Sequence, residues 1–204
     1  MLDENIYIYH WLTFTSEQLQ VDGKLEFKSK EKEDFKSFSK RIYKSMKPYP
    51  KFYKMDKLSK LAFLSGEMLL KQVDMSQYDP EKTAFILSNS SSTIETDKIF
   101  QETIDQVPSP AVFVYTLPNI MIGELSIRFG LKGENLFFVE PTFNPELLAE
   151  QVNLLFTNSA TELCITGWID FYSVDRYKSF LCLAGKSKTD YPLTAQNLGS
   201  FYNQ

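Results

Sequence analysis

Side chains that could carry out covalent chemistry are few in this chain. It contains two cysteines, Cys164 and Cys182, and a single histidine, His10. A thiolate is a strong nucleophile, and an imidazole is the side chain that most often activates one. All three residues lie within apolar runs, which is typical of buried free thiols in strands and of a structural histidine. The residue types therefore predict no activated thiol.

Other chemistries lack their usual residue patterns. The run Ser90–Ser92 offers hydroxyls, but no glycine pattern of a nucleophile elbow surrounds it, so we interpret it as a loop. Glu146 and Glu150 have helical spacing, which favours a solvated face. The glycines of 123–133 form neither a P-loop nor a dinucleotide fingerprint. Histidine and cysteine ligands for a metal are too few, so we expect no metal and no cofactor.

Charge and composition narrow the classes of partner. The net charge of −4 argues against nucleic acid, which requires a basic surface. Twelve of the cations nevertheless lie within 28–60, where they form either a solvated surface or a docking patch for an acidic partner. The aromatic content of 15%, carried by 17 Phe and 11 Tyr, favours a buried partner surface in addition to a core.

The cellular location follows from what the sequence lacks. Two cysteines make no disulfide framework, and Asp3 and Glu4 stand where a signal peptide would be basic. No apolar run reaches the roughly 18 residues of a membrane span. We therefore expect a cytoplasmic protein with no membrane span.

Strand and helix patterns alternate along the chain. The patterns predict a mostly parallel sheet covered by helices in an α/β/α arrangement. No linker or repeat interrupts them, so we expect one domain over 1–204, with a polar tail after Gly185. Strands are predicted at 5–12, after the turn at 21–25, and at 83–88, 111–114, 136–139, 163–169 and 176–183, and helices at 35–47, 56–71, 93–104, 121–129 and 145–156.

Several segments within 50–185 together resemble the β-ketoacyl-(acyl carrier protein) synthases. The resemblance is carried by PAVFVYTLPN at 110–119 with its continuation to Asn135, by FYKMDKLSKLA at 52–62, by FILSNSSST at 85–93, and by ELCITGWID at 162–170. It implies the first half of a thiolase-like fold, with a five-stranded sheet. The nearest sub-type is that of the small synthase-like proteins of aryl polyene or flexirubin-type pigment pathways.

The resemblance also implies where the chemistry should be. In that family a nucleophilic cysteine follows the strand that corresponds to 136–140, and the second half supplies two histidines, or a histidine and an asparagine. Here the cysteine position falls on Phe143, next to Thr142, and the chain has one histidine. We therefore expect no catalytic residue, and interpret the chain as a non-catalytic synthase-like subunit of fatty acid, polyketide or aryl polyene biosynthesis.

An apolar helix indicates that this subunit has a partner. The helix at 145–156 is apolar around much of its circumference, which is unusual for a helix with an exposed face. The expected partner is an active β-ketoacyl synthase or a second copy of the chain, with acyl carrier protein as a further partner. Two alternatives stay open: a minimal acyltransferase, or 3-oxoacyl synthase, that uses Thr142 or a residue from a partner, and a module that binds an acyl chain non-covalently.

Overall fold

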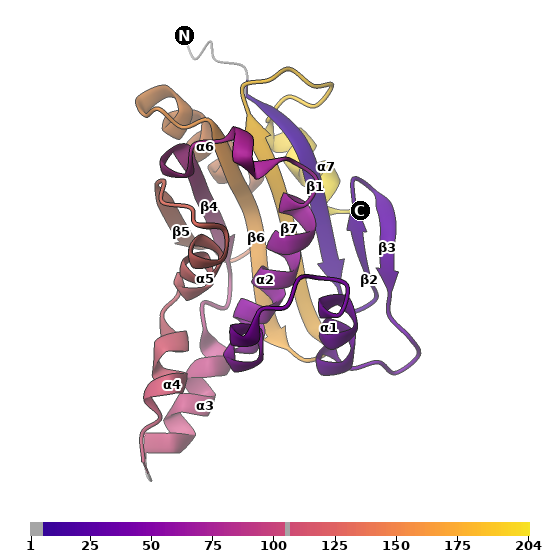
Figure 1. Ribbon diagram of the computed structural model, residues 1–204, viewed down its shortest axis with the longest axis vertical. Helices are drawn as coiled ribbons and strands as arrows, with labels where there is room; N and C mark the ends of the chain where they lie inside the picture. Colours follow the sequence, from indigo (N-terminus) through magenta and orange to yellow (C-terminus); the bar gives the residue numbers. More distant parts are fainter. Residues whose placement is uncertain (1–5, 105–106) are drawn as a thin grey trace.

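Seven strands form one sheet in the computed structural model, which describes residues 6–104 and 107–204 (Figure 1). The predicted start of the first strand at Asn5, and the acids at Asp3 and Glu4, lie outside the described residues. The order across the sheet is β3-β2-β1-β7-β6-β4-β5. The strands are β1 (Tyr7–Thr15), β2 (Gln18–Val21), β3 (Lys24–Lys28), β4 (Thr83–Asn89), β5 (Asn135–Val139), β6 (Leu163–Ser173) and β7 (Arg176–Gly185).

The α/β class is confirmed, but the expected five-stranded, mostly parallel sheet is wrong. Only two of the six strand pairs are parallel, β4 with β5 and β4 with β6, and the other four are antiparallel. Three tight hairpins cause the difference. Asp22 and Gly23 both have positive φ, which is the backbone of a two-residue hairpin turn between β2 and β3. The other two hairpins join β1 to β2 and β6 to β7.

Helices cover both faces of this sheet. Figure 1 shows α2 crossing the front of the sheet, and α3 beside α4 beyond one end of it. The helices are α1 (Phe35–Tyr43), α2 (Lys57–Leu70), α3 (Ile94–Ile104), α4 (Pro110–Phe113), α5 (Ile120–Phe129), α6 (Pro145–Asn158) and α7 (Ala195–Tyr202), with short 3₁₀ turns η1 (Pro50–Lys54), η2 (Met75–Gln77), η3 (Pro80–Lys82) and η4 (Val114–Thr116).

Strand alternation builds a separate core on each face. In β7, Leu181 and Leu183 join the core under α1, α2 and α5, whereas Phe180 and Cys182 join the core under α6 and α7. Successive side chains of a strand point to opposite faces, so one buried strand serves both cores. The expected α/β/α layering is therefore confirmed.

The segment 111–114, predicted as a strand, is helical instead. Ser109 caps the turn by accepting a hydrogen bond from the Val112 N–H, and Pro110 occupies the first turn, where its missing N–H is harmless. Phe113 and Val114 are exposed, and no strand within the described residues pairs with them. Apolar, β-branched composition suits a strand only where a neighbour supplies hydrogen bonds and a covering layer.

The C-terminal tail is more than a polar extension. Thr194 caps α7 by accepting from the Asn197 N–H, and Leu198 and Phe201 of α7 are buried in the core beneath α6. The ring of Phe201 stacks on Trp11 of β1 at 3.9 Å between centroids. Tertiary contacts therefore order a segment whose own sequence is largely polar.

Candidate functional site

The carboxyl ends of the parallel strands β4, β5 and β6 meet at one edge of the sheet. Ligands of α/β sheets commonly bind at this edge, where the chain leaves neighbouring strands in different directions. A cavity of about 420 Å³ lies here. Its lining comes from the ends of β1, β4, β5 and β6, from the start of β7 and from α7: Ser16, Ser90, Pro141, Thr142, Phe143, Trp168, Asp170, Tyr172, Asp175, Arg176, Tyr177, Lys178 and Tyr202.

A hydroxyl and a carboxylate in the lining of this cavity are joined by a hydrogen bond. Ser90 Oγ donates a hydrogen bond to Asp170 Oδ2 at 2.6 Å, and the Ser91 N–H donates to Asp170 Oδ1 at 3.3 Å. Asn89 holds the loop in place, because its side chain accepts from the Ser92 N–H and donates to the Ser92 carbonyl. The loop interpretation of the serines is thus confirmed, and Asp170 fixes their position.

Phe143 lies in a group of aromatic rings beside this pair. Its ring stacks on Tyr202 with 4.1 Å between centroids and an interplanar angle of 10°. It also makes edge contacts with Phe180 at 5.5 Å and with Trp168 at 6.2 Å. Offset stacking and edge-to-face contacts are the favourable geometries of aromatic pairs. The position that the resemblance assigns to a thiol is therefore filled by a packed ring.

Lys178 of β7 also lines the cavity. Its ammonium donates to the backbone carbonyl of Tyr202 at 2.6 Å and lies 3.7 Å from the centre of the Tyr202 ring. Burial lowers the pKa of Lys178, because desolvation disfavours the charged amine. Burial also raises the pKa of Tyr202, and the nearby charge of Asp170 adds to that shift.

The predicted site residues are only partly brought together. Thr142 is exposed and lines the cavity with Phe143, but no base among the described residues is hydrogen-bonded to its hydroxyl. His10 Nδ1 lies 2.7 Å from Asp22 Oδ2, which accepts the hydrogen bond. His10 is six residues before Ser16, the residue that follows β1 and lines the cavity, and six residues span roughly 20 Å along an extended strand. His10 therefore lies away from the cavity.

Both cysteines are buried, as predicted. Cys164 and Cys182 lie on adjacent strands in the core beneath α6 and α7. Burial raises the pKa of each thiol, which keeps both neutral and poorly nucleophilic. Among residues 6–104 and 107–204, no cluster of three or more His, Cys, Asp or Glu side chains is arranged to hold a metal ion.

Sequence reasoning identified only part of this cavity. Asp170 lay at the end of a predicted strand, but its partner Ser90 is 80 residues away. Lys178 and Tyr202 were missed, since neither lies in a recognisable motif and Tyr202 belongs to the supposed tail. The residues present can hold a ligand by hydrogen bonds, charge and aromatic contact.

Comparison of the coordinates with solved structures shows which fold positions these residues. The chain superposes on the ishigamide ketosynthase/chain length factor with a TM-score of 0.61 and 13% sequence identity, and the match covers 92% of this chain. The chain has a ketosynthase-like fold. This finding confirms the thiolase-like resemblance as a statement about fold. No family model matches the sequence, and no curated protein matches it.

Two further structures share the ketosynthase-like fold. One is the ketosynthase ApeO in complex with its chain length factor ApeC from Xenorhabdus doucetiae, with a TM-score of 0.61 at 14% identity, over 98% of this chain and 90% of that one. The other is AntDE:AntF, a type II polyketide synthase acyl-carrier protein in complex with its ketosynthase, with a TM-score of 0.58 at 13% identity over 90% of this chain. The chain spans 64% of the ishigamide chain and 62% of the matched AntDE:AntF chain.

The structure also bears on membrane insertion. Within 6–104 and 107–204, no single helix has the length and apolar composition needed to cross a bilayer. Sufficient length and apolar composition are reached only by two helical segments taken together, Pro110–Thr116 and Ile120–Phe129, and the chain bends by 99° between them.

Proposed function

We propose that this protein is a non-catalytic, ketosynthase-like subunit that pairs with an active ketosynthase. The observation that carries this proposal is the packing of Phe143 against Tyr202, Phe180 and Trp168 at the carboxyl edge of β5. Condensation requires a nucleophile that can carry and release an acyl chain, and a phenyl ring has no such atom. The ring instead stabilises the edge of the sheet where the acyl group would be attached.

The lack of an imidazole beside the hydroxyls of this cavity, within the described residues, supports the same proposal. A hydroxyl nucleophile such as that of Thr142 or Ser90 is weak unless a base removes its proton. Ser90 donates to Asp170, a carboxylate and so a weaker base than an imidazole, whereas His10 is engaged with Asp22 away from the cavity. The cavity then serves to bind or shape a chain that is held by another subunit.

The partner surface that we propose is the free edge of β5. Leu136 and Val139 on this strand are 39% and 54% exposed, and the strand carries no charge. The opposite edge, β3, is protected by Lys24, Glu26 and Lys28 in the manner of natural edge strands. An uncharged apolar edge is suited to pairing with a strand of a second subunit.

Exposed apolar side chains also occur on α3, α4 and α5. Ile127 of α5 and Phe113 of α4 are more than half exposed, and Ile94, Ile99 and Ile104 of α3 are also exposed. Large exposed apolar side chains on several elements favour an interaction site in addition to the β5 edge. The sequence pattern predicts a partner contact on α6. The four most buried side chains of α6 (Leu148, Val152, Leu155 and Phe156) already pack on the sheet and on α7, so we place the contact on another face.

The structural neighbours indicate the class of partner. The complexes named above contain ketosynthases with a chain length factor or with an acyl carrier protein. By analogy we infer a ketosynthase as the partner here, in polyketide, fatty acid or aryl polyene biosynthesis. Acyl carrier protein would then approach the cations of 28–60, and a cytoplasmic location stays a prediction.

Co-expression with a ketosynthase encoded in the same gene neighbourhood tests the proposal. We expect a stable complex by size-exclusion chromatography with light scattering, and its loss in the Leu136→Lys/Val139→Lys variant. Leu25→Lys on the β3 edge, which is 53% exposed, is the matched control and should leave the complex intact. A complex that survives both changes would show that β5 is not the interface.

The enzyme alternative has its own test. Intact-mass analysis after incubation with malonyl- and acyl-carrier protein should show no covalent adduct on this chain. An acyl adduct on Thr142 would refute the non-catalytic proposal.

The 420 Å³ cavity favours the other alternative, in which the protein is a module that holds an acyl chain non-covalently. Native mass spectrometry of the protein without a ketosynthase, with a lipid retained, would support that reading.

A further inference from the structure

A second cavity, distinct from the one at the carboxyl edge, lies between α1 and α2. Its volume is about 390 Å³, within the ~300–1,000 Å³ range of small-molecule sites. Its floor is aromatic, formed by the buried rings of Phe35 and Phe52, while Tyr53 and Val174 form exposed walls. The remaining lining residues are polar or charged: Asp34, Lys36, Ser39, Lys40, Lys57 and Lys60.

Four ammonium groups surround this apolar floor. Lys36 and Lys40, one turn apart on α1, are exposed and form no ion pair with any described acid. Lys60 is half-buried, and its ammonium donates to the Met55 carbonyl at 2.7 Å and lies 5.9 Å from the centre of the Phe52 ring. Lys57 is paired with Glu95. Three of the four cations thus have no acidic partner.

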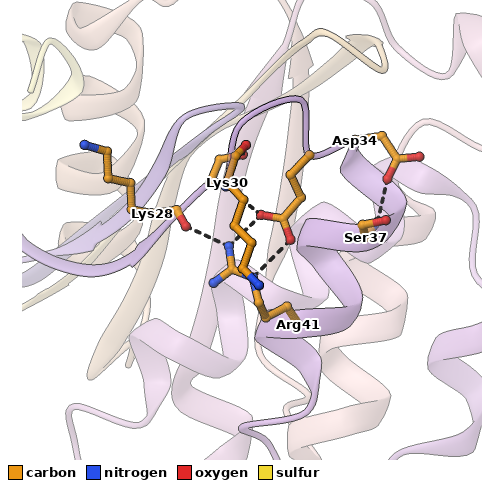
Figure 2. Close-up of polar contacts among 7 residues, drawn as sticks. Lys28, Lys30, Asp34, Ser37 and Arg41 are labelled. Atoms are coloured by element: carbon orange, nitrogen blue, oxygen red, sulfur yellow. Dashed lines mark hydrogen bonds and ion pairs between the residues drawn. The ribbon is translucent and has the colours of Figure 1, made fainter.

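The acids nearest the rim, including Asp34 of the lining, already accept hydrogen bonds from other groups. Figure 2 shows Arg41 reaching the Lys28 carbonyl, while its guanidinium pairs with Glu33 through bonds of 3.0 and 2.6 Å. Asp34 accepts the Ser37 N–H at 2.8 Å as the cap of α1, as Figure 2 also shows. The side-chain hydrogen bond from Arg41 lowers the pKa of Glu33, so this carboxylate is committed to that pair.

Asp56 is committed in the same way. It accepts the Ser59 N–H at 2.9 Å as the cap of α2, and Thr96 Oγ1 at 2.8 Å. Burial lowers the pKa of Lys60, and the neighbouring charges of Lys40, Lys57 and Lys36 add to this shift although Asp56 opposes it. The lining therefore carries an excess of positive charge, four lysines against the single carboxylate of Asp34, which an incoming anion would reduce.

We propose that the cavity between α1 and α2 binds a small amphipathic anion, with a carboxylate or phosphate head at Lys36, Lys40 and Lys60 and an apolar chain on Phe35, Phe52 and Tyr53. Lysine ammoniums act as point charges that suit either head. The apolar chain would cover the exposed side chains of Tyr53 and Val174, which an anion alone would leave in water. A small ligand fits better than a protein surface because the two floor rings lie at the bottom of a concavity.

Calorimetric titration with four soluble probes tests this site without any partner protein. The probes are octanoate, octyl phosphate, octanol and inorganic phosphate, which separate the two heads from each other and the head from the chain. We expect saturable binding of octanoate or octyl phosphate, at least tenfold tighter than that of octanol or inorganic phosphate. The better of the two octyl anions identifies the head.

Matched variants separate the cavity from general charge. Lys36→Gln/Lys40→Gln removes two rim cations, and Lys44→Gln/Lys47→Gln removes two exposed cations outside the lining. We expect the first variant to weaken binding about tenfold, as the loss of two partly exposed ion pairs would, and the second to change it less than twofold. Equal weakening in both variants, equal binding of inorganic and octyl phosphate, or no binding of either octyl anion would overturn the proposal.

Discussion

The replacement of Phe143 by alanine tests the interpretation of this ring as a packed structural residue. In the structure the ring is partly buried and contacts Tyr202, Phe180 and Trp168. Its loss removes three aromatic pairs and opens space between β5, β7 and α7. We therefore expect the Phe143→Ala variant to have a lower free energy of unfolding, as expected for a structural rather than a catalytic residue.

The magnitude follows from burial and from the ring contacts. Truncation of a fully buried phenylalanine costs about 3–5 kcal/mol, and a partly exposed one costs roughly half as much. Each aromatic pair contributes about 0.5–1.5 kcal/mol beyond the buried area, and the stacked pair with Tyr202, at 4.1 Å, is the closest of the three. The expected loss is about 2 kcal/mol, or a fall in Tm of roughly 4–8 °C for a chain of this size.

Urea unfolding followed by circular dichroism measures this loss. Phe113→Ala is the matched control, because Phe113 is 53% exposed and its one ring contact among the described residues is with Phe100 at 5.3 Å. We expect the control to lose less than about 1 kcal/mol. If Phe143→Ala loses no more than the control, the ring is not packed as described, and the main support for the non-catalytic proposal is lost.

Two further predictions concern backbone and thiols. Gly167→Ala should prevent folding or lower the free energy of unfolding by more than about 3 kcal/mol, because φ is +152° and the added carbon would lie 2.0 Å from the Phe180 carbonyl oxygen. Gly123→Ala is the control, since no atom lies within 4 Å of the added carbon, and urea unfolding should show it to be neutral or stabilising. Burial raises the folded-state pKa of Cys164 and Cys182, so the unfolding free energy should be full below about pH 8.5 and fall as the pH rises and only the unfolded thiols ionise. The double Cys→Ala variant should lose less stability between pH 8 and 10, and an unchanged pH slope would contradict the assigned cause.

Local patterns in the sequence were sufficient for most of the elements. The apolar spacing of 56–71 predicted α2, and Gly130 marked the end of α5, where its φ of +70° forms a left-handed cap. The apolar run at 83–88 predicted β4, which is buried throughout. These predictions succeed because helix periodicity, caps and fully buried strands are properties of adjacent residues.

Elements that depend on distant neighbours were not predictable in this way. The segment 111–114 has a strand composition but lacks a neighbouring strand, and α7 is ordered by contacts with β1 and α6. The sheet has seven strands rather than five because β2 and β3 extend it beyond β1. Sheet order and direction are set by pairings between residues far apart in the chain, which a local pattern does not contain.

The same division applies to the candidate site. The sequence by itself determined that the chain has one histidine and that Phe143 stands where the resemblance assigns a thiol, since these are facts of composition and order. Only the tertiary structure decided that Ser90 meets Asp170 across 80 residues, and that Tyr202 covers Phe143. The physical reason is that side-chain chemistry is encoded one residue at a time, whereas a cavity exists only after folding brings separate strand ends and helices together.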